Sequence, residues 1–446
     1  MRTPVPPRKS AQPSPGVTRR RFVKTAGGSA AALAIPAIIP ASALGRNGAT
    51  PPSERIVLGA IGVGGRGWAD LRALTSQKDV QAVAVCDVRA NRRASAKGLV
   101  DSANRNKDCA TFIDMQEMLA KRRDLDAVLI ATGDRWHARA SILAMEAGLD
   151  VYCEKPGTMT IAEGQDLVKA AATFGRVFQT GAQRLSEPNF VFATELARSG
   201  RLGRIETVRA HLWNHVRDVT HNAWLPEQPL PDPAELDWNR WLGPVPYRPY
   251  NKEYLGGCGA WGIYWDLAAG VAGWGSHTII QCQAAIRSEH AAPVSYGYPG
   301  NKSGDGLEAA FADGVKLVMQ LSGWRGSCGV RFEGTDGWVS IADGYRRPDA
   351  SHPALLDEFE TVVNRYREQT GRSLSHLRDF LDCVRSRRTP MAGPQFTHAS
   401  MTANHAMNLC LYLERDLEWD PKTETFAGDD EANRMRARAA RSYLKA

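Results

Sequence analysis

The feature that most constrains the fold of this chain is a glycine pattern directly after a short apolar run. Residues 56–61 read Ile-Val-Leu-Gly-Ala-Ile, and Gly62, Gly64 and Gly67 then fit the pattern G-x-G-x-x-G. In a strand–turn–helix unit the first glycine allows a tight turn, the second lets the backbone approach a diphosphate, and the third lets the helix pack closely on the strand. The segment predicts a dinucleotide site, although a glycine-rich turn without a nucleotide has the same pattern.

An acidic residue follows the second predicted strand, as it does in many dinucleotide-binding units. Residues 80–86 are mostly apolar, and Asp87 comes directly after them. A carboxylate at this place can accept both hydroxyls of an adenine ribose and repels a 2′-phosphate, which favours NAD over NADP. Arg89 weakens that preference, so NADP stays an alternative. The other interpretation of Asp87 is a residue that ends a strand or caps a helix.

Strands and helices continue to alternate up to about residue 180. Further strands are expected at 126–131, 149–153 and 176–179, and helices at 136–147, with Asp134 as its cap, and at 161–173. Alternation with six strands in all predicts an α/β fold with a doubly wound parallel sheet. We assign residues 54–180 to this Rossmann domain and residues 181–446 to a C-terminal domain.

The C-terminal domain has the pattern of a second sheet. Strands are expected at 206–211, 278–285, 308–311, 315–320 and 338–341. A Pro-rich stretch, 226–249, is too long for a turn and predicts an ordered surface excursion or flap. With 446 residues and 43% hydrophobic content, the chain is long enough for two domains with cores of their own.

The formal net charge of +8 is concentrated at the N-terminus. Residues 1–43 contain no acid, and their charged residues are all basic: Arg2, Arg8, Lys9, Arg19, Arg20, Arg21 and Lys24. The rest of the chain is therefore close to neutral. Nucleic-acid binding loses its electrostatic basis, so no nucleic-acid partner is expected.

Residues 1–43 have the three parts of an export signal. A basic stretch is followed by an apolar run at 26–39, which is too short to span a bilayer, and by Ala41-Ser42-Ala43, which is typical of a signal peptidase site. The basic part resembles a twin-arginine signal, with Val23 where leucine is more usual. This predicts export of the folded protein to the periplasm by the twin-arginine machinery, with 44–53 as a linker. The alternatives are a membrane anchor or a disordered basic tail.

The cysteine pattern predicts neither a disulfide framework nor a zinc site. The eight cysteines form no C-x-x-C pair, and most lie in apolar stretches. Folding before export would keep them in a reducing compartment, so we expect buried free thiols. His211 and His215 are four residues apart but in a strand-like pattern, and no metal site is expected.

Several short motifs together resemble the glucose–fructose oxidoreductase/inositol dehydrogenase (Gfo/Idh/MocA) family. They cover nearly all of residues 54–446 and lie at 132–137 (TGDRWH), 153–156 (CEKP), 179–183 (QTGAQ), 274–277 (WGSH), 380–386, 419–421 and 428–433. The resemblance implies a Rossmann domain followed by a C-terminal α/β domain with an open, mainly antiparallel sheet. Because that sheet often mediates dimers in the family, a homodimer or a dimer of dimers is expected.

The resemblance implies two catalytic residues. It places Lys155 beside the nicotinamide, where an ammonium can stabilise a developing alkoxide and help to move its proton. It also implies that His277 is the base, since a neutral imidazole suits proton abstraction near pH 7. The acids that usually lie four residues before and three after this histidine are here Gly273 and Ile280. The alternatives are an exposed loop lysine and a structural histidine.

Three more residues are implied to hold the cofactor. Glu154 would contact a ribose, and Thr132 and His137 match a motif beside the nicotinamide end. Within that motif Gly133 replaces the usual proline and Arg135 replaces a frequent histidine. A role at the start of a helix is the other interpretation of His137.

The substrate site is expected to combine hydroxyl-binding groups with aromatic rings. Gln183 and Arg184 would donate to substrate hydroxyls, although Arg184 could equally form a surface ion pair. Asp266 could replace a lost acid near His277. Flat rings stack on sugar faces, so the candidates include Tyr264 together with Trp261 and Trp265, with core packing as the alternative.

These residues predict an NAD(P)-dependent oxidoreductase acting on a secondary hydroxyl of a sugar, polyol or glycoside. Because an exported enzyme works away from the soluble NAD pool, we expect its cofactor to stay bound and to be recycled internally. One alternative is an NAD-dependent glycosidase that oxidises, eliminates and reduces again. A second is a non-catalytic sugar- or nucleotide-binding protein of the same fold.

Overall fold

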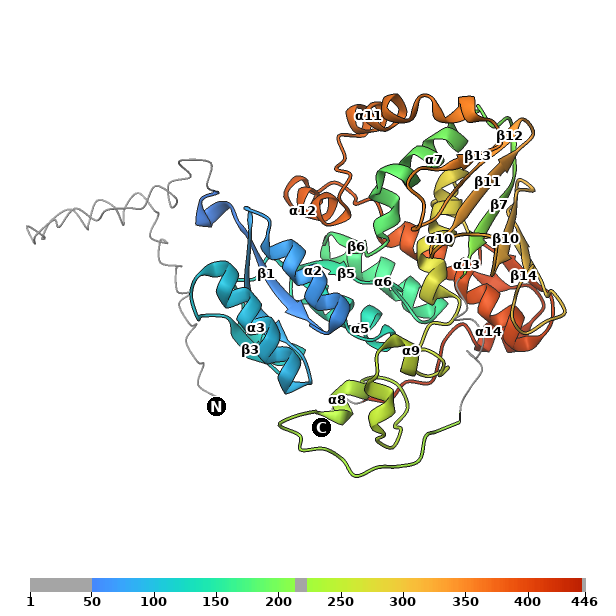
Figure 1. Ribbon diagram of the computed structural model, residues 1–446. Coiled ribbons are helices and arrows are strands. Elements are labelled where there is room, and N and C mark those ends of the chain that lie inside the picture. The colour runs from blue at the N-terminus through green and yellow to red at the C-terminus, as the bar shows by residue number, and fades with distance from the viewer. Residues whose placement is uncertain (1–49, 213–222, 443–446) are drawn as a thin grey trace, which may run out of the picture. The chain divides into compact units, whose positions relative to one another are not determined.

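The computed structural model describes residues 50–212 and 223–442, so the predicted export signal lies outside the described residues. Six strands form the first sheet, in the order β3-β2-β1-β4-β5-β6 (Figure 1). All neighbouring pairs are parallel. Their bounds are β1 Ile56–Ile61, β2 Val80–Cys86, β3 Ala110–Phe112, β4 Ala127–Ile130, β5 Asp150–Cys153 and β6 Phe178–Thr180. This order is that of a doubly wound dinucleotide fold, which confirms the prediction. β3 is the strand whose position had not been predicted.

Helices connect these strands and cover both faces of the first sheet. They are α2 Gly65–Thr75, α3 Ala90–Asn104, α4 Met115–Lys121, α5 Asp134–Glu146 and α6 Ile161–Phe174. One face buries Leu58, Leu71 and Tyr152, and it is completed by Phe380 of α12 (His376–Ser386). The rings of Tyr152 and Phe380 meet edge to face, 5.7 Å apart. A helix from the C-terminal part of the chain therefore belongs to the core of the Rossmann sheet.

The second sheet has nine strands, in the order β13-β12-β11-β7-β10-β9-β8-β14-β15. All paired neighbours are antiparallel except β7 and β10, which run parallel. The bounds are β7 Ile205–His211, β8 Ser295–Gly297, β9 Glu308–Ala310, β10 Lys316–Gln320, β11 Val330–Gly334, β12 Gly337–Ile341, β13 Asp349–Ala350, β14 Leu417–Asp420 and β15 Thr425–Phe426. Four of the five predicted strands are confirmed, and the mainly antiparallel sheet is as expected.

The prediction of a strand at 278–285 is wrong, because these residues form the second half of helix α10, Ala272–Ala285. The error has a physical reason. Twelve of the fourteen residues of α10 are buried, so the helix has no polar face whose period would mark it as a helix. A short apolar run with Ile279 and Ile280 is equally typical of a buried strand.

The remaining helices surround the second sheet and the junction between the two sheets. They are α7 Pro188–Arg198, α11 Phe359–Thr370, α13 Pro394–Leu413 and α14 Asp430–Arg434, with short 3-10 turns at Pro52–Glu54, Gln183–Ser186, Lys252–Leu255 and Pro353–Leu356. Helices α7, α10 and α13 share a core with the inner side of the sheet. Among the described residues, no helix has the length and apolar character to cross a membrane. All eight cysteines are free, and all but Cys258 are buried.

An excursion from residue 223 to residue 261 packs against the Rossmann domain. It contains α8, Trp238–Leu242, and α9, Cys258–Trp261 (Figure 1). The amide of Ala90 donates to Glu235 O at 2.9 Å, and the indole of Trp136 donates to Arg240 O at 2.9 Å. This excursion has a small hydrophobic core of its own around Trp238. The Pro-rich stretch is therefore ordered, as predicted, and lies beside the carboxyl ends of β2 and β4.

Candidate active site

A cavity of about 720 Å³ lies at the carboxyl edge of the first sheet. Ligands of doubly wound sheets bind there, where the strand order reverses between β1 and β4. Seven of the eight residues predicted to hold a cofactor line it: Gly62, Gly64, Asp87, Thr132, His137, Glu154 and Lys155. The excursion supplies the opposite wall, including Trp241, Tyr254 and Trp261. The volume is in the usual range for ligand pockets.

The glycine loop fits a dinucleotide, and glycine suits each of its three positions for a different reason. Gly62 has φ +76°, and a Cβ there would lie 2.6 Å from the amide nitrogen of Thr132. A Cβ on Gly67 would lie 2.1 Å from Gly62 O, so this glycine lets α2 pack on the end of β1. A Cβ on Gly64 would meet nothing within 4 Å. Gly62 and Gly67 are therefore required by the fold, whereas Gly64 leaves open the space that a diphosphate needs.

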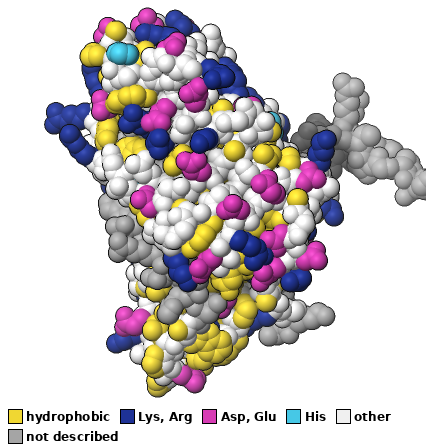
Figure 2. All heavy atoms as spheres, turned by 90° about the vertical axis from the view of Figure 1, so that its right-hand side faces the viewer, with side chains coloured by type: hydrophobic (Ala, Val, Ile, Leu, Met, Phe, Trp, Pro, Cys, Tyr) yellow, Lys and Arg dark blue, Asp and Glu magenta, His cyan; other side chains and the backbone are white. Residues whose placement is uncertain are grey.

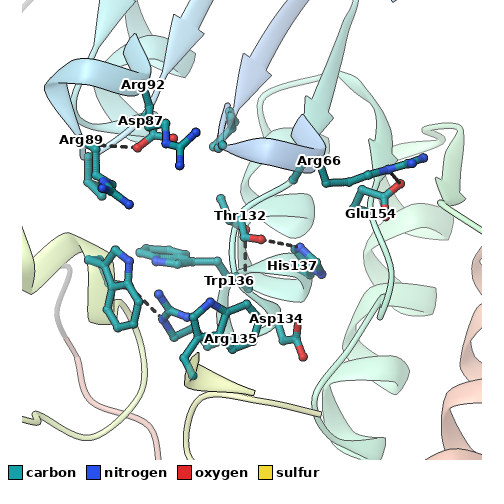
Figure 3. A pocket seen from close by; sticks show the side chains of 18 of the residues that line it. Arg66, Asp87, Arg89, Arg92, Thr132, Asp134, Arg135, Trp136, His137 and Glu154 are labelled. Atoms are coloured by element: carbon teal, nitrogen blue, oxygen red, sulfur yellow. Dashed lines mark hydrogen bonds and ion pairs between the residues drawn. The ribbon is translucent and has the colours of Figure 1, made fainter. Parts of the chain in front are cut away.

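Asp87 is held in place by the backbone. Its Oδ2 accepts a hydrogen bond from the amide of Val63 at 2.9 Å, and its Oδ1 accepts one from the amide of Arg89 at 2.9 Å. Burial raises the pKa of Asp87, while these bonds and the charges of Arg89 and Arg92 oppose the shift. Both arginines lie beside Asp87 on the cavity wall (Figure 3). Each carboxylate oxygen keeps a lone pair, so support of the loop leaves Asp87 able to accept from a ribose hydroxyl, and ribose binding stays a prediction.

A charged network that the sequence analysis missed surrounds Glu154. Arg66 of α2 donates to Glu154 Oε1 at 3.2 Å and pairs with Asp70 at 2.9 Å. Gln183 Nε2 donates to the same Glu154 oxygen at 2.5 Å. Burial, and then the neighbouring Glu154 carboxylate, raise the pKa of Asp70. Glu154 is thus fixed at the end of β5, and Gln183 contacts it instead of lining the cavity.

Lys155 lines the cavity and is oriented by the start of α10. Its Nζ donates to Gly273 O at 2.9 Å and lies 5.3 Å from the centre of the Trp274 ring. Gly273 is the position at which the family usually has an acid. A backbone carbonyl and the face of an indole take the place of a carboxylate in orienting the Lys155 ammonium, because both attract a positive charge.

His277 lies one turn further along α10 and is almost completely buried, with 4% of its surface exposed. It does not line the cavity, and within the described ranges its Nδ1 has no hydrogen-bond partner. Burial, and then the positive charge of Lys155, lower the pKa of His277 well below its ordinary value. The imidazole is therefore neutral at pH 7. Its roles as base and as structural histidine both stay open.

The loop after β4 is tied to the loop after β5 through His137. The Nδ1 of His137 lies 2.6 Å from Pro156 O, and its Nε2 lies 3.3 Å from Thr132 O (Figure 3).

The prediction that Asp134 caps α5 is wrong, because the N-cap is Gly133. Asp134 Oδ2 accepts instead from the amide of Ala269 at 3.0 Å, since the chain before α10 lies closer than its own helix amides. The carboxylate joins the two domains.

Apart from Trp261, the remaining predicted substrate residues do not line this cavity. Arg184 makes two hydrogen bonds to Asp343, at 2.9 and 2.8 Å, which matches the ion-pair alternative. Asp266 accepts from Arg248 at 3.0 Å, and the same guanidinium lies 4.8 Å from the centre of the Tyr264 ring. Trp261 does line the cavity. Trp265 packs on Tyr412, with ring centres 5.0 Å apart. Substrate contacts of Gln183, Arg184, Asp266 and Tyr264 stay predictions.

Other lining residues had no role in the sequence-based prediction. They are Arg66, Arg92, Asp114, Arg240, Trp241, Tyr254 and Cys258, together with Arg135, whose departure from the family motif was the available signal. The excursion residues carried no signal because their place depends on tertiary packing. Among the described residues, no group of three or more His, Cys, Asp or Glu side chains could hold a metal ion.

Two domains of a known family match this chain. Residues 56–182 match "Oxidoreductase family, NAD-binding Rossmann fold", and residues 205–446 match "Oxidoreductase family, C-terminal alpha/beta domain". The chain belongs to the Gfo/Idh/MocA oxidoreductase family. Its first domain is accordingly an NAD-binding Rossmann domain, as the glycine loop and Asp87 had predicted.

Two kinds of name occur among the curated relatives of this Gfo/Idh/MocA protein. A "Glycosyl hydrolase family 109 protein" of Stenotrophomonas maltophilia is 27% identical over 227 residues, which cover 50% of this chain and 48% of the relative. An "Inositol 2-dehydrogenase" of Salmonella typhimurium is 31% identical over 158 residues, covering 35% and 45%. The chain spans about half the length of the curated relatives it matches.

Solved structures share the fold of this family member at low sequence identity. The WlbA dehydrogenase of Chromobacterium violaceum, in complex with NADH and UDP-GlcNAcA, has a TM-score of 0.59 at 16% identity, covering 83% of this chain and 98% of that one. The myo-inositol 2-dehydrogenase of Lactobacillus plantarum has a TM-score of 0.54 at 17% identity, covering 82% and 99%. At such identities the likeness concerns the fold.

Proposed function

We propose that this protein oxidises a secondary hydroxyl of a sugar, polyol or glycoside with NAD as the acceptor. One observation carries the proposal: Lys155 and the open face of the glycine loop line the same cavity. An amine donor therefore lies in the space that the dinucleotide would share with a substrate. Bound NAD would supply the hydride acceptor, and the residues of the chain would supply binding and proton transfer.

Lys155 would act on the substrate oxygen. An ammonium has three donors, and Gly273 O takes one of them, so others remain for the hydroxyl that becomes a carbonyl. A positive charge at this place stabilises the alkoxide as it forms. His277 would receive the proton only through Lys155, because its neutral imidazole does not line the cavity and burial disfavours its charged form.

The nucleotide content of the protein tests this proposal first. Nucleotide released by heat from freshly purified protein is expected to be NAD or NADH. The loaded protein should then form NADH with at least one sugar or polyol from a panel. A protein that carries no nucleotide and binds none when it is added would instead support the non-catalytic alternative.

A second candidate is a glycosidase with no net oxidation. Two observations favour it: relatives named glycosyl hydrolase family 109, and the replacement of both acids around His277 by Gly273 and Ile280. The test is turnover of glycosides without an added acceptor in deuterated water. Solvent deuterium on the carbon next to the oxidised position, with retained cofactor, would support cleavage. Stoichiometric release of free NADH would support the simple dehydrogenase.

We also propose that the protein works in the periplasm with its cofactor permanently bound. The basis is the twin-arginine pattern in residues 1–43, because that pathway carries folded proteins across the membrane. Changing Arg19 and Arg20 together to lysine should keep the full-length protein in the cytoplasm. Continued appearance outside the inner membrane would point to another export route.

We propose a dimer that uses the outer side of the second sheet. Figure 2 shows the side of the molecule that carries this sheet, with charges of both signs among hydrophobic side chains. On its outer face Arg209 and Arg331 both pair with Glu333, and Arg331 stacks on Trp338 at 3.9 Å. Light scattering should give twice the chain mass, and Trp338→Asp should lower it. An unchanged mass in that variant would place the contact elsewhere.

A further inference from the structure

A buried arginine on the cavity wall lacks a carboxylate partner. Arg135 is only 4% exposed, and it lines the cavity beside Asp134 and Trp136 (Figure 3). Within the described part of the chain its NH1 has no hydrogen-bond partner, and the guanidinium forms no ion pair. By contrast, Arg66 and Arg240, which line the same cavity, pair with Glu154 and Asp114 respectively. Arg135 is therefore a buried cation on the cavity wall that forms no ion pair within the described part of the chain.

The position of Arg135 depends on two neighbours. Its guanidinium carbon lies 3.7 Å from the centre of the Trp241 ring, and its Nε donates to Trp241 O at 2.8 Å. On the other side, a Cβ on Gly133 would lie 2.3 Å from the Arg135 NH1. Glycine at 133 thus makes the room that the guanidinium occupies. The two departures from the family motif therefore lie against each other, and a larger residue at 133 would displace the arginine.

The charge balance around Arg135 is unfavourable in the absence of an anion. Taking a cation out of water is costly, and the contacts of the guanidinium with the rings of Trp241 and Trp261 offset only part of that cost. Burial lowers the pKa of Arg135 to about 9, and the nearby charge of Asp134 opposes that shift. Asp134 already accepts from the amide of Ala269. The guanidinium stays charged at neutral pH and can gain from an oxyanion.

We propose that Arg135 binds a carboxylate of the substrate, so that this site prefers acidic sugars such as hexuronic acids to neutral ones. The proposal rests on the proposed function, because it assigns a substrate class to the same site. The planar fork of a guanidinium matches a carboxylate. Lys155 lines the same cavity, so one molecule can present its reacting hydroxyl to Lys155 and its carboxylate to Arg135.

The cofactor diphosphate is another source of oxyanions, but it has other donors. The amides at the start of α2 follow Gly64, where the space around the backbone is open. Arg66 belongs to that helix and lines the cavity as well. Arg135 follows β4 instead and packs against the excursion. We therefore assign it to the substrate.

The test compares sugars that differ only in the carboxylate. NAD-loaded wild-type protein and the Arg135→Met variant are titrated by calorimetry with glucuronate and glucose, and with galacturonate and galactose. Methionine keeps much of the length and apolar contact of the arginine stem. Arg72→Met is the control, because it also removes a guanidinium that lies over a tryptophan, 5.7 Å from the centre of the Trp68 ring, but the residue is exposed and does not line this cavity. Each variant is also titrated with NAD and unfolded by heat.

In the wild type, at least one uronate should bind ten times more tightly than its neutral partner. Arg135→Met should lose that preference while its affinity for NAD and for the neutral sugar is unchanged, and Arg72→Met should keep it. Three results would overturn the proposal: no preference in the wild type, weakened NAD binding that assigns Arg135 to the diphosphate, or equal weakening of both sugars with a lower melting temperature. Because calorimetry measures binding, uronate binding without nicotinamide reduction would contradict the proposed oxidation and leave this site standing.

Discussion

The two walls of the cavity are built in different ways. The cofactor wall, Gly62–Gly67 with Asp87, comes from one strand–turn–helix unit and the strand beside it. The reaction wall, defined here as Lys155 with Arg135 and the start of α10, joins segments more than a hundred residues apart, as in the contact of Lys155 with Gly273. The first wall is fixed by backbone geometry. The second is fixed by side-chain contacts between the two domains.

The largest expected effect is on the reaction wall. Lys155→Ala should lower turnover by at least about 100-fold, because the group that stabilises the alkoxide is lost. NAD binding should be retained, since the lysine is assigned to the substrate. The measurements are reduction of bound nicotinamide and calorimetric titration with NAD. Lys316→Ala, an exposed residue of β10, is the control. Near-normal turnover would remove Lys155 from the catalytic residues.

The cofactor wall should respond through stability. Gly67→Ala places a Cβ 2.1 Å from Gly62 O, which is backbone, so the free energy of unfolding should fall by about 1–3 kcal/mol or more. Gly98→Ala is the control, because a Cβ in the middle of α3 meets nothing within 4 Å and should stabilise by up to about 1 kcal/mol. Denaturant unfolding measures both changes. Equal stability of the two variants would contradict the close packing of α2 on β1.

A substitution at Gly64, on the cofactor wall, should affect ligand binding but not stability. Gly64→Ala should leave the unfolding free energy nearly unchanged, since its Cβ meets nothing within 4 Å. NAD affinity should nevertheless fall, because the methyl group enters the space assigned to the diphosphate. Calorimetry beside the unfolding measurement distinguishes the two effects. Unaltered NAD affinity would place the diphosphate elsewhere.

A smaller effect is expected from Asp87→Ala. The preference for NAD over NADP should fall by about tenfold, since a ribose acceptor is lost and Arg89 and Arg92 remain beside the site. Asp87→Asn keeps an acceptor for the loop amides, so its preference for NAD over NADP should lie between those of the wild type and Asp87→Ala. Titration of nucleotide-free protein with both nucleotides is the measurement. If the ratio stays the same, Asp87 supports the loop but does not bind the ribose.

The smallest effect concerns pH: protonation of His277 should cause no change in turnover near neutral pH. The folded pKa of His277 lies well below 6.5, so its imidazole stays neutral as the pH falls from 7.5 to about 6. Turnover should show no loss centred near pH 6.5 from this group. The unfolded chain binds a proton there and the folded chain does not, so folding stability should decrease as the pH falls below about 6.5. A rate profile with a limb at pH 6.5 that His277→Asn removes would show that the imidazole titrates normally.

Apart from β3, the strands of the Rossmann half could be predicted to within two residues, because their signals are local. β1 and β2 begin and end where the apolar runs do, and the bend at Gly62 needs only the chain around it. The short β3 escaped because three half-exposed residues give no period. In the second half α10 was mistaken for a strand, since a helix buried on all sides has no amphipathic pattern.

The sequence by itself determined the fold class and the dinucleotide loop, and it singled out Lys155, which lines the cavity, because each of these depends on neighbours in the chain or on a motif. Only the tertiary structure decided that Gly273 orients Lys155, that Arg184 pairs with Asp343, and that Arg135 is buried under Trp241. The physical reason is distance along the chain. Such contacts form when helices and loops pack across the two sheets, and no local pattern of residues specifies which side chains will then meet.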